Sequence, residues 1–140
     1  MLRILIVDDE KSLRLTLKAF LVGDGYDVVT AEDGEEALTV FEQGGIDVVL
    51  TDILLPRRNG IDLLRAIRDS GSRVPVILMT GEPSLDGAAA AIRGKAFDYL
   101  PKPITKETVV EAVAAAVQEK KREDEFERLR EHEALSRRMK

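Results

Sequence analysis

Short, mainly apolar runs in this 140-residue sequence are each followed directly by polar side chains that could do chemistry. These residues are Asp8 and Asp9, Asp52, Thr80 and Lys102. Carboxylates gathered in one place repel one another, and a hard divalent cation such as Mg²⁺, which prefers oxygen ligands, relieves that repulsion. Three carboxylates, a hydroxyl and an ammonium group therefore predict a site that binds Mg²⁺ and a phosphoryl group.

Asp52 is the predicted nucleophile, because it follows the central run, where a carboxylate can attack phosphorus to give an acyl phosphate. Asp9 and Asp52 would bind the metal, with Asp8 acting through water. The ammonium of Lys102 can neutralise one phosphoryl oxygen, and the hydroxyl of Thr80 can donate to another. No general base is required for this chemistry.

Each of these residues also has a simpler structural interpretation. Asp8 or Asp9 could cap the first predicted helix, since Asp is a favoured N-cap residue. Thr80 could be an ordinary loop hydroxyl, and Lys102 a solvated surface charge. What favours a functional site is the joint occurrence of all of them after four different predicted strands.

The elements that must position these residues are read from the alternation of short β-branched runs with longer stretches of helical spacing. This alternation is typical of βα units and a parallel sheet. The predicted strands cover residues 3–7, 27–31, 48–51, 76–79 and 98–100. In an open parallel α/β sheet the functional crevice lies beyond the carboxyl ends of the strands, where the polar residues are expected to meet.

The helical segments between these strands carry apolar faces that should pack on the sheet. The fourth segment, residues 85–93, is rich in alanine and offers little beyond Leu85 and Ile92 to bury. We therefore expect it to be held more weakly than the others and to move. The predicted faces consist of Leu13, Leu17, Phe20 and Leu21 in the first helix and of Leu63, Leu64 and Ile67 in the third.

Residues 105–140 contain no Gly or Pro and predict one long helix that begins at Thr105. Its first part can pack through Val109, Val110, Val113 and Val117. Beyond residue 119, acids and bases alternate with only a thin apolar stripe, so this part projects into solvent, pairs as a coiled coil or joins a missing domain. We expect a domain at residues 1–120 and a charged helical extension at 121–140.

Composition restricts the function further. Without cysteine, and with His132 as the single histidine, the chain has no thiolate or histidine-rich metal site. A net charge of −5 argues against direct nucleic-acid binding. The first apolar run reaches Asp8 too soon for a signal peptide or a membrane span, so no membrane association is expected and a cytoplasmic location fits.

The polar residues lie in segments that resemble the receiver domain of two-component response regulators over about residues 1–120. This resemblance implies a doubly wound α/β fold with five parallel strands in the order 2-1-3-4-5, of the flavodoxin-like or CheY-like type. It also implies transfer of a phosphoryl group to Asp52 from a histidine kinase or phosphotransfer protein. The matching segments are Ile6-Val7-Asp8-Asp9-Glu10, Thr51-Asp52-Ile53-Leu54-Leu55-Pro56 with Gly60 eight residues after Asp52, Met79-Thr80-Gly81 and Tyr99-Leu100-Pro101-Lys102-Pro103.

The same resemblance assigns further roles. The backbone carbonyl of Leu54 is implied as a metal ligand, and Thr80 and Tyr99 are implied as a coupled switch. The Lys102-Pro103 peptide bond is implied to be cis. Leu54 and Glu82 are implied to tune the access of water to the acyl phosphate. A homodimer through the fourth and fifth helices, or through the C-terminal extension, is possible.

Alternatives from other classes stay open at this point. A hydrolase of the haloacid dehalogenase type would need an Asp-x-Asp pair after its first strand, where this chain has Asp8-Asp9-Glu10. A flavodoxin-like carrier would need phosphate-binding hydroxyls and glycines there. A non-catalytic interaction module would use the long helix as a dimerisation arm. The chain could be part of a longer regulator, kinase or cyclase, or a single-domain regulator with a tail.

Overall fold

A computed structural model, in which residues 1–139 are described, contains one parallel sheet with the strand order β2-β1-β3-β4-β5. The predicted fold class and strand order are thus confirmed. Three strands each run one residue beyond the prediction, which makes Asp52 and Thr80 the last residues of their strands. The strands are β1 (Arg3–Val7), β2 (Asp27–Ala31), β3 (Val48–Asp52), β4 (Val76–Thr80) and β5 (Asp98–Pro101).

The register of the sheet brings the carboxyl ends of neighbouring strands to one edge. Val7 pairs with Thr51, Asp52 with Met79, and Thr80 with Pro101 in the parallel ladders. The central strands β3 and β4 are buried at every position, as expected for a parallel sheet covered on both faces. The polar residues that end these strands therefore meet at one rim.

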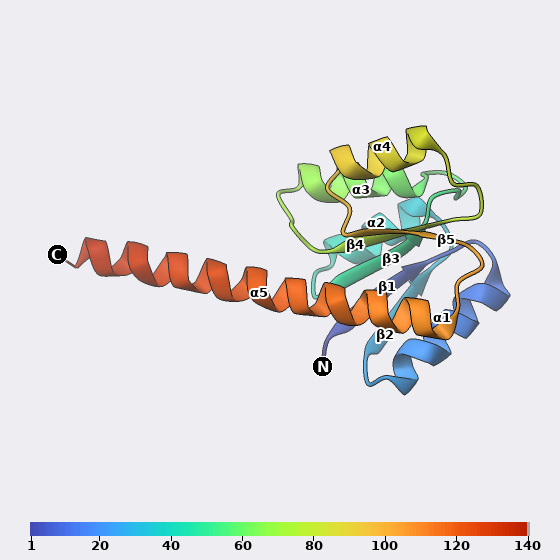
Figure 1. Cartoon of the computed structure of the whole chain (residues 1–140). Coiled ribbons are helices and arrows are strands. Elements are labelled where there is room, and N and C mark those ends of the chain that lie inside the picture. Colours follow the sequence, from blue (N-terminus) through green and yellow to red (C-terminus); the bar gives the residue numbers. More distant parts are fainter. Residues whose placement is uncertain (140) are drawn as a thin grey trace.

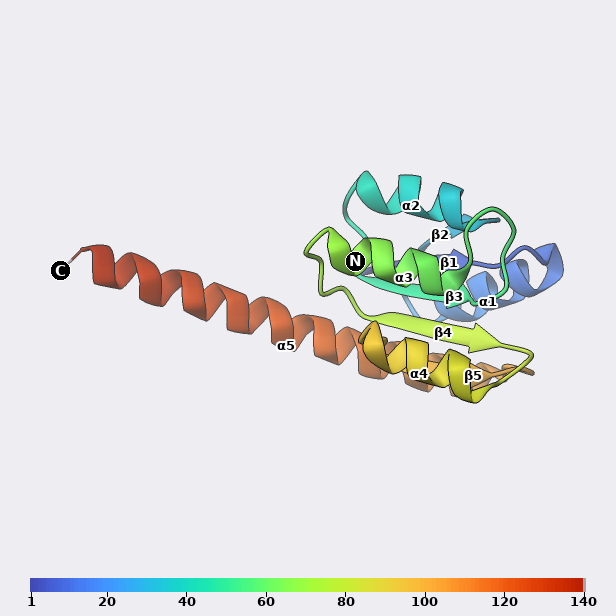
Figure 2. The same ribbon diagram turned by 90° about the horizontal axis from the view of Figure 1, so that it is seen from above.

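Helices cover both faces of the sheet, in two apolar layers (Figures 1 and 2). One layer is made by α1 (Lys11–Gly23) and the first half of α5 (Lys106–Arg138), and the other by α2 (Gly34–Glu42), α3 (Gly60–Asp69) and α4 (Leu85–Arg93). The predicted face of the third helix is buried as expected, and that of the first helix is buried at two of its four positions, with Leu13 and Phe20 half-buried. Their fully buried residues are Leu17 and Leu21 in α1 and Leu63, Leu64 and Ile67 in α3.

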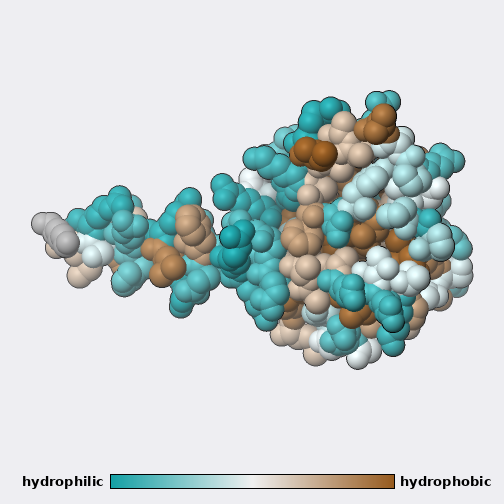
Figure 3. Space-filling view, in the orientation of Figure 1, coloured by the Kyte–Doolittle hydropathy of each residue, from teal (hydrophilic) through white to brown (hydrophobic). Residues whose placement is uncertain are grey.

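The attachment of α4 differs from the prediction. Leu85 and Ile92, expected to be its buried side chains, are 90% and 78% exposed, and Ala91 is buried instead. A small side chain lets the helix lie close to the layer beneath it, and the two large residues, seven positions apart, then share the outer face. Hydrophobic colour is accordingly visible over this helix in Figure 3.

The long C-terminal helix is continuous from Lys106 to Arg138, with the Thr105 side chain accepting a hydrogen bond from the N–H of Thr108 at its start. Val109, Val113 and Val117 are buried against the sheet, and the helix then leaves the domain as a mainly hydrophilic rod (Figures 1 and 3).

Two ion pairs hold the base of this extension. Lys120 lies 3.7 Å from Asp47, and Arg73 lies 3.7 Å from Glu123. Lys140, the last residue of the predicted helix, lies outside the described residues. Within residues 1–139, no helix combines the length and apolarity needed to cross a bilayer.

Candidate functional site

Three carboxylates converge where β1 and β3 end. Asp8 and Asp9 follow β1 directly, and Asp52 is the last residue of β3; each offers an oxygen within 4.8 Å of the others. Asp8 and Asp52 are buried, whereas Asp9 is exposed at the rim. A set of carboxylate oxygens with one side open to solvent suits Mg²⁺, which binds through few protein ligands and keeps several waters.

The charged form of Asp8 is destabilised by its surroundings. One of its oxygens accepts a hydrogen bond from the N–H of Glu10 at 2.8 Å, and Glu10, rather than either aspartate, is the N-cap residue of α1. Burial raises the pKa of Asp8, and the nearby charge of Asp52 adds to this; the hydrogen bonds from Glu10 and Lys102 oppose the shift without cancelling it. A cation at this position would stabilise the charged carboxylate.

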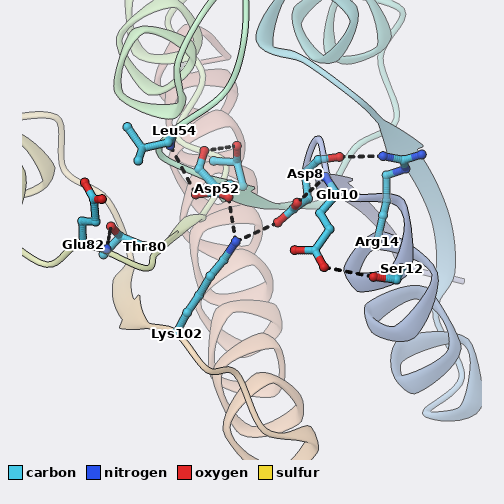
Figure 4. A network of polar contacts seen from close by, with 10 residues as sticks. Asp8, Glu10, Ser12, Arg14, Asp52, Leu54, Thr80, Glu82 and Lys102 are labelled. Carbon is cyan, nitrogen blue, oxygen red and sulfur yellow. Dashed lines mark hydrogen bonds and ion pairs between the residues drawn. The ribbon is translucent and has the colours of Figure 1, made fainter.

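Lys102 reaches into the same place from the end of β5. Its Nζ atom lies 2.7 Å from Oδ2 of Asp52 and 3.1 Å from Oδ2 of Asp8 (Figure 4). Burial alone would lower the pKa of Lys102, but hydrogen bonds and charges from Asp52 and then Asp8 outweigh it, so the pKa is raised. The ammonium is therefore charged at neutral pH. The Lys102-Pro103 bond is cis, as expected.

Thr80 and Tyr99, the expected switch pair, are both bonded to the loop between β4 and α4. The Thr80 hydroxyl, almost fully buried, accepts a hydrogen bond from the N–H of Glu82 at 3.0 Å (Figure 4). The Tyr99 hydroxyl accepts one from the N–H of Ser84 at 3.4 Å. The side chain of Tyr99 is half-buried and packs with the α2–α4 layer, outside the acidic cluster. The two hydroxyl groups are thus hydrogen-bonded to the same loop.

The loop between β3 and α3 carries Leu54. Its N–H donates to Oδ1 of Asp52 at 3.2 Å, and its side chain is 57% exposed (Figure 4). At the end of this loop, a Cβ atom on Gly60 would overlap the backbone carbonyl oxygen of Asp52. A residue without a side chain is needed there, because α3 begins directly against the end of β3.

Sequence reasoning missed a buried arginine beside the site. The side chain of Arg14 in α1 donates from Nη1 to the backbone oxygen of Asp8 at 2.8 Å and from Nη2 to Glu32 at 3.4 Å. The helical spacing does predict that Arg14 is buried, since it lies three residues before Leu17 and seven before Leu21, on the buried side of an amphipathic helix. A charge at such a position indicates a specific partner.

Curated relatives of the chain include the response regulator MprA of Mycobacterium avium (strain 104) and that of Mycobacterium tuberculosis (strain H37Rv). The first is 34% identical over 126 residues, which are 90% of this chain and 55% of that protein. The second is 34% identical over 125 residues, 89% of this chain and 54% of that protein. The chain spans about half the length of the curated relatives it matches.

The chain is also similar to proteins of known structure. A response regulator receiver domain protein from Clostridium thermocellum is 37% identical with a TM-score of 0.81, covering 86% of this chain and 98% of that one. The chemotaxis protein CheY4 of Vibrio cholerae is 30% identical with a TM-score of 0.78, covering 83% and 98%. Residues 4–114 match the family model described as the response regulator receiver domain. The chain therefore belongs to the response regulator receiver domain family of two-component signalling.

Proposed function

We propose that Asp52 accepts a phosphoryl group from the phosphohistidine of a histidine kinase or phosphotransfer protein, with Mg²⁺ held by Asp8, Asp9, Asp52 and the Leu54 carbonyl. The observation that carries this proposal is the contact of the Asp52 carboxylate with the Lys102 ammonium beside two further carboxylates. These are the groups that attack, neutralise and position a phosphoryl group. We place this reaction in the cytoplasm.

In the transfer, a carboxylate oxygen of Asp52 forms a bond to phosphorus while the phosphorus–nitrogen bond of the donor breaks. The donor imidazole leaves with the electron pair of that bond and takes a proton from solvent. Bound Mg²⁺ supplies positive charge that neutralises phosphoryl oxygens. The Lys102 ammonium breaks its ion pair with Asp52 and forms a new one with a phosphoryl oxygen. The Thr80 hydroxyl donates a hydrogen bond to another phosphoryl oxygen.

The proposed conformational change begins with a hydrogen bond that Thr80 must break. Its hydroxyl accepts the Glu82 N–H in the present state, so turning toward a phosphoryl group breaks this bond. The loop that contains Glu82 also holds the Tyr99 hydroxyl through Ser84, so both contacts change together. A few charge-assisted bonds to phosphate can bias a two-state element of this kind.

Partners beyond the phosphoryl donor are proposed from exposed apolar residues. Leu85 and Ile92 on α4, and Phe126 and Leu129 on the extension, offer surfaces for a homodimer. The extension would connect such a dimer to an output domain in a longer protein. Constitutive dimerisation without phosphorylation is the second candidate function, and the long exposed helix is the observation that favours it.

Intact mass measured after incubation with acetyl phosphate, with and without Mg²⁺, tests the proposal on the wild type and on Asp52→Asn. A metal-dependent gain of one phosphoryl group in the wild type, absent in the variant, supports it. Equal gain in Asp52→Asn would place the phosphoryl group elsewhere. The absence of any gain under all conditions would favour the constitutive dimerisation module.

A further inference from the structure

We propose that Glu32 and Asp33, the two residues that link β2 to α2, are positioning residues for the Mg²⁺ site, acting through Arg14 and Arg57. The inference rests on the proposed function, because it concerns the proposed metal site. Neither linking residue belongs to the acidic cluster itself. We refer to these four residues together with Gly34 as the β2–α2 brace.

The first arm of the brace holds the loop that carries Asp8 and Asp9. Arg14 is buried, with 8% of its surface exposed, and its Nη1 atom donates to the Asp8 carbonyl while Nη2 donates to Glu32. That carbonyl belongs to the peptide unit that joins the two aspartates. Because the guanidinium is a rigid planar fork, contacts with acceptors in two different segments orient it, and its short buried bond holds the Asp8 carbonyl in turn.

The second arm holds the loop that carries Leu54 and follows Asp52. One carboxylate oxygen of Asp33 accepts the N–H of Glu36 at 2.8 Å and so caps α2, and the other pairs with Nε of Arg57 at 3.1 Å. Arg57 lies in the β3–α3 loop and has φ +65°, which is uncommon for a residue with a side chain. The carboxylate that begins α2 therefore also retains the loop in this tight conformation.

A backbone contact joins the same two segments independently of these charges. Gly34, the first residue of α2, approaches the β3–α3 loop so closely that a Cβ atom there would overlap the carbonyl oxygen of Arg58. The start of α2 and the β3–α3 loop are thus in contact through the backbone as well as through an ion pair. Their relative position cannot change without breaking both contacts.

The functional consequence concerns the two loops that supply the metal ligands. Asp8 and Asp9 lie in one loop, and Asp52 with Leu54 begins the other, so the distance between these loops sets the geometry that the cation meets. The brace ties both loops to one short link. Substitution of groups that orient metal ligands without touching the metal commonly lowers metal affinity by about 10- to 100-fold. Loss of the brace should therefore weaken metal binding while every ligand remains present.

Glu32→Gln tests the first arm and should weaken metal binding by about threefold, because the Glu32 side chain is largely exposed. Two further variants test the second arm, and all three leave every metal ligand in place. Asp33→Asn keeps the cap of α2, because Asn is as good an N-cap as Asp, but removes the charge that faces Arg57. Its matched control is Asp27→Asn, since Asp27 pairs with Nε of Arg3 at the same 3.1 Å, at the opposite end of β2. Gly34→Ala drives the loop away, and its control is Gly23→Ala, where a Cβ atom has nothing within 4 Å.

Mn²⁺ binding to the unphosphorylated full chain, followed by the electron paramagnetic resonance signal of the free ion, is the direct measurement. We expect about threefold weaker binding for Asp33→Asn, whose partner is largely exposed, and about tenfold for Gly34→Ala, with both controls at wild-type affinity. The Mg²⁺ concentration needed for half-maximal phosphorylation by acetyl phosphate should rise likewise. The rate at saturating Mg²⁺ should stay within about twofold of the wild type, since the catalytic groups are intact.

Three results would overturn the inference. If the wild type binds Mn²⁺ and all three brace variants bind it equally well, the brace has no positioning role, and the proposed function stands. The same conclusion follows if saturating Mg²⁺ fails to restore the rate of folded variants, which would indicate general damage. If the wild type itself does not bind Mn²⁺, the proposed metal site fails first. Should Gly34→Ala fail to fold, Glu32→Gln and Asp33→Asn decide between these outcomes.

Discussion

The Nζ atom of Lys102 lies 2.7 Å from Oδ2 of Asp52, although Lys102 directly follows β5, which lies two places from β3 in the sheet. The other oxygen of the same carboxylate accepts the N–H of Leu54. Both oxygens of the proposed nucleophile are thus occupied in this state. Each oxygen keeps a second lone pair for attack on phosphorus. The ammonium is the partner whose positive charge can move to the incoming phosphoryl group.

Removing this ammonium should have opposite effects on metal binding and on chemistry. In Lys102→Met, we expect phosphorylation by acetyl phosphate to slow by about 100-fold, because one donor to the phosphoryl oxygens is lost. Mn²⁺ should bind more tightly, since a positive charge beside three carboxylates is gone. Phosphorylation rates and Mn²⁺ titration measure the two effects, with Lys18→Met, an exposed lysine of α1, as the control. Weaker Mn²⁺ binding in Lys102→Met would contradict the electrostatic argument.

Neutralising Asp8 should stabilise the protein without metal. Because the pKa of Asp8 is raised in the fold, its favourable contribution is complete below its ordinary pKa of 3.8 and is lost as the pH rises through the higher folded value. At pH 7 the charged carboxylate is then a net cost. Urea unfolding of Asp8→Asn in EDTA at pH 7 should show a gain of about 1 kcal/mol.

The same variant should lose this advantage in two ways. As the pH is lowered, the gap to the wild type should close, because Asp8 itself becomes protonated. With Mg²⁺ present, the order should reverse, since the wild type gains more from metal that binds only the folded state. A variant that is less stable than the wild type at pH 7 in EDTA would show that the hydrogen bonds of the carboxylate outweigh its burial.

Tyr99 can report the proposed switch in isolation. The chain contains two tyrosines and no tryptophan, so in a Tyr26→Phe background the tyrosine fluorescence comes from Tyr99 alone. We expect acetyl phosphate with Mg²⁺ to change its emission, because the Tyr99 hydroxyl leaves the N–H of Ser84. Adding Thr80→Ala should abolish the change while intact mass still shows phosphorylation. A full change in the Thr80→Ala protein would separate the two residues, and Mg²⁺ alone serves as the blank.

The extension should drive self-association. Phe126 and Leu129, three residues apart on one side of the helix, are 53% and 55% exposed, and pairing would bury them. We expect sedimentation to show a concentration-dependent dimer in the wild type that is lost in the double variant Phe126→Glu, Leu129→Glu. Glu131→Gln, which changes only a surface charge, should leave it intact. A strict monomer at all concentrations, with and without phosphorylation, would count against this role.

The sequence alone determined the fold class and the location of the site. Apolar runs such as 48–51, buried on both faces, alternate with amphipathic stretches, and this pattern has few solutions other than a parallel sheet between helices. Parallel strands end at one edge, so polar residues directly after several strands had to meet there. For this reason the sequence predicts that Asp8, Asp9, Asp52 and Lys102 form one group.

Tertiary structure decided which faces were buried and which loops touched. The helix at residues 85–93 has apolar side chains on more than one side, so its spacing could not show that Ala91, and not Leu85 or Ile92, would face the layer beneath. The contact of Asp33 with Arg57 joins residues 24 positions apart in two loops. Neither loop has a periodicity that predicts its partner, because a loop takes its conformation from the segments packed around it.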